Sequence, residues 1–175
     1  RRKSNYQNLH LSNSSYAIQK ITNSICYFRY FKELNQSAKS NTMNYWLLKT
    51  EPGTFSWSDL ERDKKAVWDG VRNFQARSNM KAMKKGAWAF IYHTGEEKSV
   101  VGIAEVTREF YPEPKAPDWV AVDLKPVKKL KLPVALSTIK ADKLLASMVL
   151  VKVARLSVQP VRKEEFDRIL ERSEK

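Results

Sequence analysis

The chain has 175 residues, of which 42% are hydrophobic and 29% charged, a composition typical of a globular domain with a buried core. Its formal net charge of +13 favours a polyanionic partner, because a basic surface attracts phosphate backbones. The single cysteine, Cys26, excludes an intramolecular disulfide, and no apolar run reaches the roughly 18 residues of a membrane-spanning helix. We therefore expect a reducing compartment and no membrane association, the cytoplasm in a bacterium or the nucleus in a eukaryote.

Residues 1–42 differ in composition from the rest of the chain. They are rich in Ser, Asn and Gln, and Glu33 is their only acidic residue. Because the segment lacks a steady hydrophobic period, we expect a weakly structured N-terminal extension, or upstream sequence translated together with the domain. The folded domain is expected to span residues 43–172.

The first elements of this domain are predicted from short, strongly patterned stretches. Residues 45–49 form an aromatic and aliphatic run suited to a buried strand. Ser56 followed by Asp59 is a capping pattern, which predicts a helix through about residue 63. Residues 66–68 form the second predicted strand.

Residues 73–84 are predicted to form a helix with an apolar seam and a basic row. The apolar residues recur at helical spacing, and the basic residues lie about a quarter-turn away. The seam consists of Ala76, Met80, Met83 and Ala87. The basic row consists of Arg77, Lys81 and Lys84. Such a helix packs its seam on a core and presents its cations to solvent.

Residues 87–92 and 98–110 are predicted to pair as an antiparallel hairpin, because both are apolar and a turn containing glycine lies between them. Residues 111–118 contain three prolines, which predict an exposed loop. The alternation of apolar and polar residues after Trp119 predicts a half-buried strand.

The C-terminal part is predicted to consist of short elements. Helices are expected at residues 137–140, 143–147 and 163–170, and strands at residues 150–151 and 156–158, the latter ended by Pro160. Strands with helices inserted early and late indicate a small mixed α+β barrel rather than a doubly wound sheet.

The residues that most enzymes and metal sites need are scarce. From Met43 onward the chain has no cysteine and one histidine, His93, so zinc-ligand spacing is absent. No phosphate-loop or dinucleotide-binding glycine motif occurs, and the paired acids Glu96 and Glu97 lie in a turn. We therefore expect no metal, no cofactor and no catalytic residues, and the chain is not expected to be an enzyme.

Aromatic residues near basic ones are the remaining signal. Unpaired bases are held by stacking on aromatic rings, while polar groups read their edges. Trp46 and Trp88 lie within predicted strands and are expected in the core. Trp68 and Trp119 stand at strand ends beside loops, so they are the better candidates for the walls of a base pocket.

Four motifs, in order along the chain, resemble the EVE domain family. They are YWLLKTEP (residues 45–52), WDGVRNFQAR (68–77), YHTG (92–95) and VGIAEV (101–106). The resemblance extends from about residue 43 to about residue 170. It implies a PUA-like fold, a mixed β-barrel of about five or six strands with flanking helices, related to the YTH domain that binds a methylated adenine in RNA.

The resemblance also implies a pocket for a flipped base between the ends of the first two strands. Trp119 stands where a second wall could come from, and Thr94 keeps the hydroxyl of a serine that is usual in the family. Phe74 stands where tyrosine is common and is expected to serve in packing, with Val71 and Ala76. The implied base-pocket residues are Lys49, Thr50, Glu51, Trp68, Asp69, Tyr92, His93, Thr94 and Trp119. The implied phosphate-binding residues are Arg72, Asn73, Arg77, Lys81 and Lys98.

These residues support the hypothesis of a nucleic-acid-binding reader domain. A modified base, for example a methylated or oxidised cytosine, would lie face-on to Trp68, and Thr50, Glu51 and Asp69 would read its polar edge. The expected partner is DNA or RNA carrying a modified base, bound by a monomer. Two alternatives stay open: an enzyme acting on a modified base or nucleotide, with His93 and Glu51 or Asp69 as acid and base, and a protein-interaction module whose basic surface is incidental.

Overall fold

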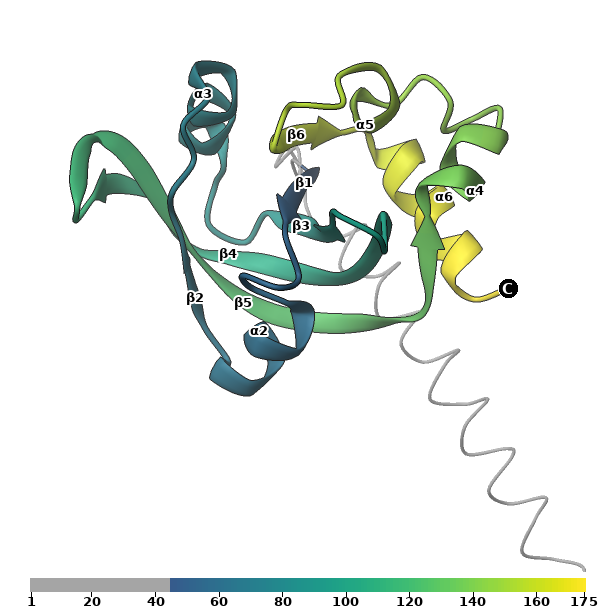
Figure 1. Cartoon of the computed structure of the whole chain (residues 1–175), viewed down its shortest axis with the longest axis horizontal. Helices are drawn as coiled ribbons and strands as arrows, with labels where there is room; N and C mark the ends of the chain where they lie inside the picture. Colours follow the sequence, from purple (N-terminus) through teal and green to yellow (C-terminus); the bar gives the residue numbers. More distant parts are fainter. Residues whose placement is uncertain (1–44) are drawn as a thin grey trace, which may run out of the picture. The chain divides into compact units, whose positions relative to one another are not determined.

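The computed structural model describes residues 45–175, a mixed α+β fold built on one six-stranded sheet (Figure 1). The strands are β1 (Tyr45–Thr50), β2 (Ala66–Trp68), β3 (Trp88–His93), β4 (Ser99–Glu113), β5 (Ala116–Ala135) and β6 (Val158–Val161). The helices are α2 (Trp57–Asp63), α3 (Phe74–Ala82), α4 (Leu136–Ala141), α5 (Val149–Lys152) and α6 (Lys163–Ser173). The fold class predicted from the sequence is confirmed, and the predicted extension of residues 1–42 lies outside the described residues.

The sheet has the strand order β2-β5-β4-β3-β1-β6, with β2 and β6 at its edges. β1 pairs parallel with β3, and all other pairs are antiparallel, including the predicted hairpin of β3 and β4. The long strands β4 and β5 curve across the whole domain (Figure 1). Helix α3 packs against both β5 and β6, and the Asn79 side-chain amide donates to the Val158 carbonyl oxygen at 2.7 Å. Helix α3 therefore connects the edge strand β6 with β5, which lies next to the other edge strand.

Strand alternation gives the sheet two buried faces. On β1, Trp46 and Leu48 belong to the main core, together with residues of α2, α3 and β5. Leu47 points to the other face, where Phe166 of α6 stacks on Phe90 with ring centroids 4.2 Å apart. Residues that pair across β1 and β3 point to the same face of the sheet. Successive residues along each strand therefore point to opposite faces.

Within residues 45–175, no helix is long and apolar enough to cross a membrane.

The predicted helix cap at Ser56 and the predicted apolar seam of α3 are confirmed. The Ser56 hydroxyl accepts from the Asp59 backbone N–H at 3.2 Å, and the Asp59 carboxylate accepts from the Ser56 N–H at 2.8 Å, a reciprocal capping box. The seam residues of α3 and its flank are all buried. These features depend on local sequence, which is why the sequence predicts them well.

The predicted proline loop at residues 111–118 is wrong. β4 continues to Glu113 and β5 begins at Ala116, so only a tight turn separates them. The pairing shifts register beside Pro112, and such irregularities tolerate a residue that lacks an N–H. Pro160 likewise lies inside β6 instead of ending it, because β6 is an edge strand whose free side needs no donor.

Two predictions for the C-terminal part are also wrong. Residues 150–151 belong to the one-turn helix α5 rather than to a strand, since an apolar pair has no period that separates the two. Residues 143–147 form turns rather than a helix. Their chain direction is set by Asp142, whose carbonyl oxygen accepts from the backbone N–H groups of Leu145 and Ala146. The same residue fixes α6 through its side chain.

The buried carboxylate of Asp142 makes the stability of the domain dependent on acid pH. It accepts from Arg172 Nη2 at 2.6 Å and from Arg168 Nε at 2.8 Å. Hydrogen bonds from Arg172 and Arg168 lower the pKa of Asp142 to about 2. Because this pKa lies below that of an unfolded aspartate, near 4, the contribution is complete above pH 4 and is lost as the pH falls toward 2.

We expect Asp142→Asn to lower the melting temperature at pH 7 and to flatten its fall between pH 4 and pH 2. Thermal melts across this range measure the effect. The control is Asp167→Asn on α6, whose exposed carboxylate pairs with Lys163 at 2.7 Å. Equal acid profiles for wild type and Asp142→Asn would show that this carboxylate does not couple stability to pH.

Candidate nucleic-acid interface

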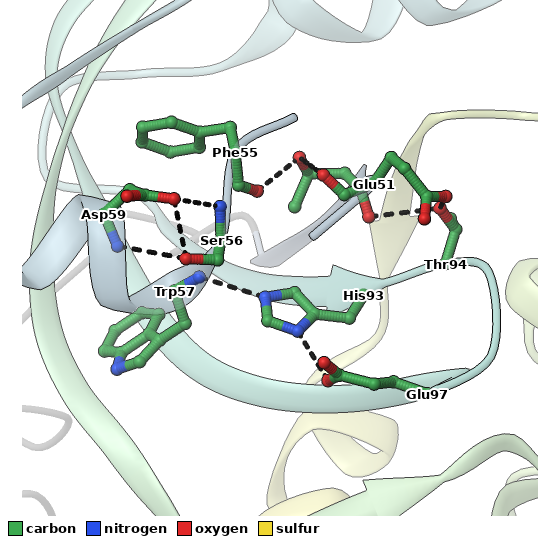
Figure 2. A network of polar contacts seen from close by, with 9 residues as sticks. Glu51, Phe55, Ser56, Trp57, Asp59, His93, Thr94 and Glu97 are labelled. Atoms are coloured by element: carbon green, nitrogen blue, oxygen red, sulfur yellow. Dashed lines mark hydrogen bonds and ion pairs between the residues drawn. The ribbon is translucent and has the colours of Figure 1, made fainter. Parts of the chain in front are cut away.

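The ends of β1 and β3 are tied together by backbone and hydroxyl contacts (Figure 2). The Thr50 hydroxyl donates to the Phe55 carbonyl oxygen at 2.7 Å, and the Thr94 backbone N–H donates to the Thr50 carbonyl oxygen at 2.8 Å. The Thr94 hydroxyl donates to Oε2 of Glu51 at 2.6 Å. The exposed Glu51 carboxylate is therefore held in a defined position at the rim of the domain.

Gly95 is the reason that the carboxylate can lie there. A Cβ atom at this position would stand 2.6 Å from Oε1 of Glu51 and 3.2 Å from Oε2. The backbone of Gly95 also has φ +64°, a conformation that glycine adopts without strain. The glycine thus provides both the turn and the room for an acceptor group at the surface.

His93 is engaged at both ring nitrogens. Its Nε2 accepts from the backbone N–H of Trp57 at 3.0 Å, and its Nδ1 lies 2.6 Å from Oε2 of Glu97 (Figure 2). Since Nε2 is the acceptor, Nδ1 carries the proton and donates a hydrogen bond to the carboxylate of Glu97. Trp57 is the first residue of α2, so His93 satisfies an otherwise unpaired donor at the helix start. This arrangement fixes α2 against the sheet.

Trp68 lies at the end of β2 and is 8% exposed, within the main core. Its ring meets the partly buried ring of Phe55 edge to face, with centroids 6.2 Å apart. Asp69, the next residue, is exposed. Trp68 and Thr50 are therefore connected through Phe55, a residue that the sequence did not single out. The expected open stacking face of Trp68 is covered by its packing in the core.

Lys49 and Tyr92 lie on the other side of the sheet. They pair in register on β1 and β3, one position before Thr50 and His93. The Lys49 ammonium lies 5.7 Å from the Tyr92 ring centroid and donates to the Ala154 carbonyl oxygen at 2.7 Å. Burial lowers the pKa of Lys49 and raises that of Tyr92. Strand alternation, visible in the sequence, already separates these two residues from the Thr50 face.

Arg72 is bound within the protein. Its guanidinium makes two hydrogen bonds of 2.7 Å to the carboxylate of Glu113, which is 4% exposed. This contact lowers the pKa of Glu113. The Gly70 backbone N–H also donates to Glu113, at 3.2 Å. The expectation that Arg72 holds a phosphate is therefore weakened, and its role in the structure is to fix the segment after β2 to the end of β4.

Phe74 is exposed, and its expected packing role is wrong. It is 69% exposed and stacks obliquely on Trp119, with centroids 5.4 Å apart. The guanidinium of Arg77 lies 5.0 Å from the Phe74 ring and 5.2 Å from the Trp119 ring. Trp119 thus belongs to a cluster beside α3 together with Phe74 and Arg77. The helix start places Phe74 outward because Ala76 and Met80 occupy the core-facing side.

The remaining predicted phosphate ligands separate into three places. The Asn73 side chain caps α3 by accepting from the Ala76 N–H at 2.9 Å. Lys81 lies on α3 with its ammonium 5.9 Å from the Phe110 ring. Lys98 lies in the turn before β4, beside a hollow lined by Glu96 and Leu136 among others. Lys98 immediately precedes β4, whereas Lys81 lies over Phe110 near the far end of that strand, so these two lysines stand beside opposite ends of β4.

Comparison with known proteins shows the family of the chain. The EVE domain family model matches residues 44–172. The chain belongs to the EVE domain family.

Curated EVE relatives include thymocyte nuclear protein 1 of several vertebrates. The mouse protein (Mus musculus) is 37% identical, and the match covers 74% of each chain. The human protein (Homo sapiens) is 35% identical, covering 77% of this chain and 76% of its own.

Solved structures resemble this EVE domain as well. A protein from Rhodopseudomonas palustris is 44% identical with a TM-score of 0.72, covering 75% of this chain and 93% of its own. A crystal structure of human THYN1 protein in complex with 5-methylcytosine-containing DNA is 33% identical, with a TM-score of 0.70. It covers 75% of this chain and 98% of that one. The fold of the DNA-bound relative and that of this EVE domain therefore correspond over nearly the entire relative.

The EVE domain presents acceptors, rings and cations at its surface. Glu51 and Asp69 are exposed acceptors, and Arg77 and Lys81 are cations on α3. Among residues 45–175, no group of three or more His, Cys, Asp or Glu side chains could hold a metal ion. Acceptors suit the exocyclic amine of a base, and cations suit phosphates.

Proposed function

We propose that this EVE domain binds DNA that carries a modified cytosine. The observation that carries the proposal is that human THYN1, which shares the fold over 98% of its chain, was crystallised with DNA containing 5-methylcytosine. The base would enter at the rim between the ends of β1 and β2. Flanking phosphates would lie along α3, beside Arg77 and Lys81.

The rim supplies two kinds of contact that a methylated cytosine needs. The N4 amine of cytosine is a donor, and Glu51 and Asp69 are exposed acceptors at the two strand ends. The 5-methyl group is apolar, and the partly buried ring of Phe55, which contacts Trp68, is an apolar group that could meet it. Because Trp68 is largely covered, the base would contact the Phe55–Trp68 edge rather than an open indole face.

A binding panel tests the proposal. The full chain is titrated with strands of one sequence that carry cytosine, 5-methylcytosine or 5-hydroxymethylcytosine, as DNA and as RNA, and fluorescence anisotropy gives each Kd. We expect tighter binding to a modified DNA strand than to the plain one. Equal Kd values for all cytosine forms would contradict the proposal. A preference for the modified base seen only with RNA strands would show that DNA is not the nucleic acid that the domain recognises.

We expect Arg77→Gln to weaken the binding of plain and of modified strands to the same extent. Phosphate contacts position a nucleic acid without reading its bases, and each one adds about one unit to the slope of log K against log salt. The measurement is Kd at several salt concentrations. Arg155→Gln, which removes an exposed cation after α5, is the matched control and should leave the slope unchanged. An unchanged slope in Arg77→Gln would place the phosphates elsewhere.

A further inference from the structure

Large exposed rings beside cations recur along α3. Phe74 is 69% exposed and Phe110 of β4 is 43% exposed. Isolated exposed apolar side chains are common on proteins. Here, however, Arg77 lies over Phe74 and Trp119, and Lys81 lies over Phe110. We name Phe74, Arg77, Lys81, Phe110 and Trp119 the α3 stripe.

The α3 stripe follows one side of the helix. Residues 74, 77 and 81 are spaced at i, i+3 and i+7, which places them on one helix face. Helix α3 packs beside β4 and β5 (Figure 1), and its cations lie over Phe110 of β4 and Trp119 of β5. Seven residues of helix rise by roughly 10 Å, which is comparable to the length of three stacked nucleotides. Phe74 lies at one end of this helical row, and the Phe110 ring lies 5.9 Å from the Lys81 ammonium at its other end.

The cations of the α3 stripe are available to a ligand. Among residues 45–175, no carboxylate forms an ion pair with Arg77 or Lys81, and Arg77 instead donates to the Asp118 carbonyl oxygen at 2.8 Å. Two acids of β4 are engaged with other cations, since Glu113 binds Arg72 and Glu109 binds Lys84. Exposed rings with unpaired cations fit a polyanion with aromatic faces better than they fit an acidic or apolar protein surface.

We propose that the α3 stripe binds unpaired nucleotides next to the recognised base by stacking them on Phe74 and Phe110. This inference rests on the proposed function, because it assumes that a nucleic acid is the ligand. A closed duplex hides the faces of its bases, so exposed rings can stack only on a strand that is single or locally opened. The domain therefore prefers single-stranded DNA to duplex DNA of the same sequence.

The test compares variants of the full chain on four DNA ligands. They are a single strand of about 12 nucleotides with one 5-methylcytosine, its plain counterpart, and the duplex of each, with Kd measured at one salt concentration. We expect Phe74→Ala to weaken single-strand binding about tenfold, as loss of one stacked base does. In Phe74→Ala, the ratio of the Kd values for the methylated and plain strands should equal that of wild type. Phe74→Trp should bind the single strand about as tightly as wild type does.

Leu132→Ala is the matched control, since Leu132 is 46% exposed on β5 and lies outside the α3 stripe. The inference would be overturned if Phe74→Ala bound the single strand as tightly as wild type does, or if wild type preferred the duplex. In either case, tighter binding of the methylated strand than of the plain strand would keep the proposed function. Loss of affinity in Phe74→Ala without any methyl preference in wild type would keep the α3 stripe and overturn the proposed function. Binding of no oligonucleotide, or of a protein partner alone, would overturn both.

Discussion

Gly102→Ala should lower the melting temperature of the domain by roughly 10 °C, about 3 kcal/mol in the free energy of unfolding. A Cβ atom on Gly102 would stand 2.4 Å from two ring atoms of Trp57. Trp57 is fully buried in the main core, so its ring cannot swing into solvent. The backbone N–H of Trp57 donates to His93 at 3.0 Å, so a backbone shift that moves the ring away would break this hydrogen bond at the start of α2.

Thermal unfolding followed by circular dichroism measures this effect. Gly53→Ala is the matched control, because nothing lies within 4 Å of a Cβ atom there and its φ is not positive. The control should melt within a few degrees of wild type. A Gly102→Ala protein as stable as the control would show that Trp57 does not pack on this strand.

Glu51→Gln should weaken binding of the modified strand about tenfold and reduce its advantage over the plain strand. The amide replaces one carboxylate oxygen by a donor, so the amine of cytosine loses a charge-assisted acceptor. Thr94 and Gly95 hold the wild-type carboxylate in place, which makes the acceptor preorganised. Kd values for both strands, with a melting curve to confirm the fold, give the result.

The control for this variant is Glu96→Gln in the same turn region. Glu96 is exposed, and its substitution removes the same charge two residues after Thr94. Loss of a negative charge reduces repulsion of the phosphate backbone, so Glu96→Gln should leave both Kd values unchanged or lower them slightly. The contradicting result is that Glu51→Gln changes both Kd values in the same way as Glu96→Gln does. In that case Glu51 would not read the base.

Local patterns in the sequence predict much of the fold. The Ser56–Asp59 capping box and the buried seam of α3 follow from spacing alone, and so does the pairing of β3 with β4. The positions of prolines misled the prediction, because Pro160 lies on an edge strand and Pro112 lies beside irregular pairing. Those outcomes depend on which strand sits at the edge of the finished sheet.

The candidate site is less predictable because tertiary partners decide it. Nothing local indicates that Arg72 meets a buried Glu113 from a strand 41 residues away, or that Phe74 remains exposed on Trp119. Lys49 differs, since strand alternation alone places it on the face opposite Thr50. The resemblance to the EVE family proposes site residues by their positions in the motifs, and the structure determines which of those side chains meet.

The central claim is that a modified cytosine binds at the rim between β1 and β2. The most direct measurement is an intermolecular nuclear Overhauser experiment on the protein bound to a strand with a single 5-methylcytosine. We expect cross-peaks from the 5-methyl protons to the ring protons of Phe55 or Trp68. Methyl contacts found only at Tyr92 and Lys49, on the opposite face of the sheet, or only in the turn around Lys98, would contradict the account.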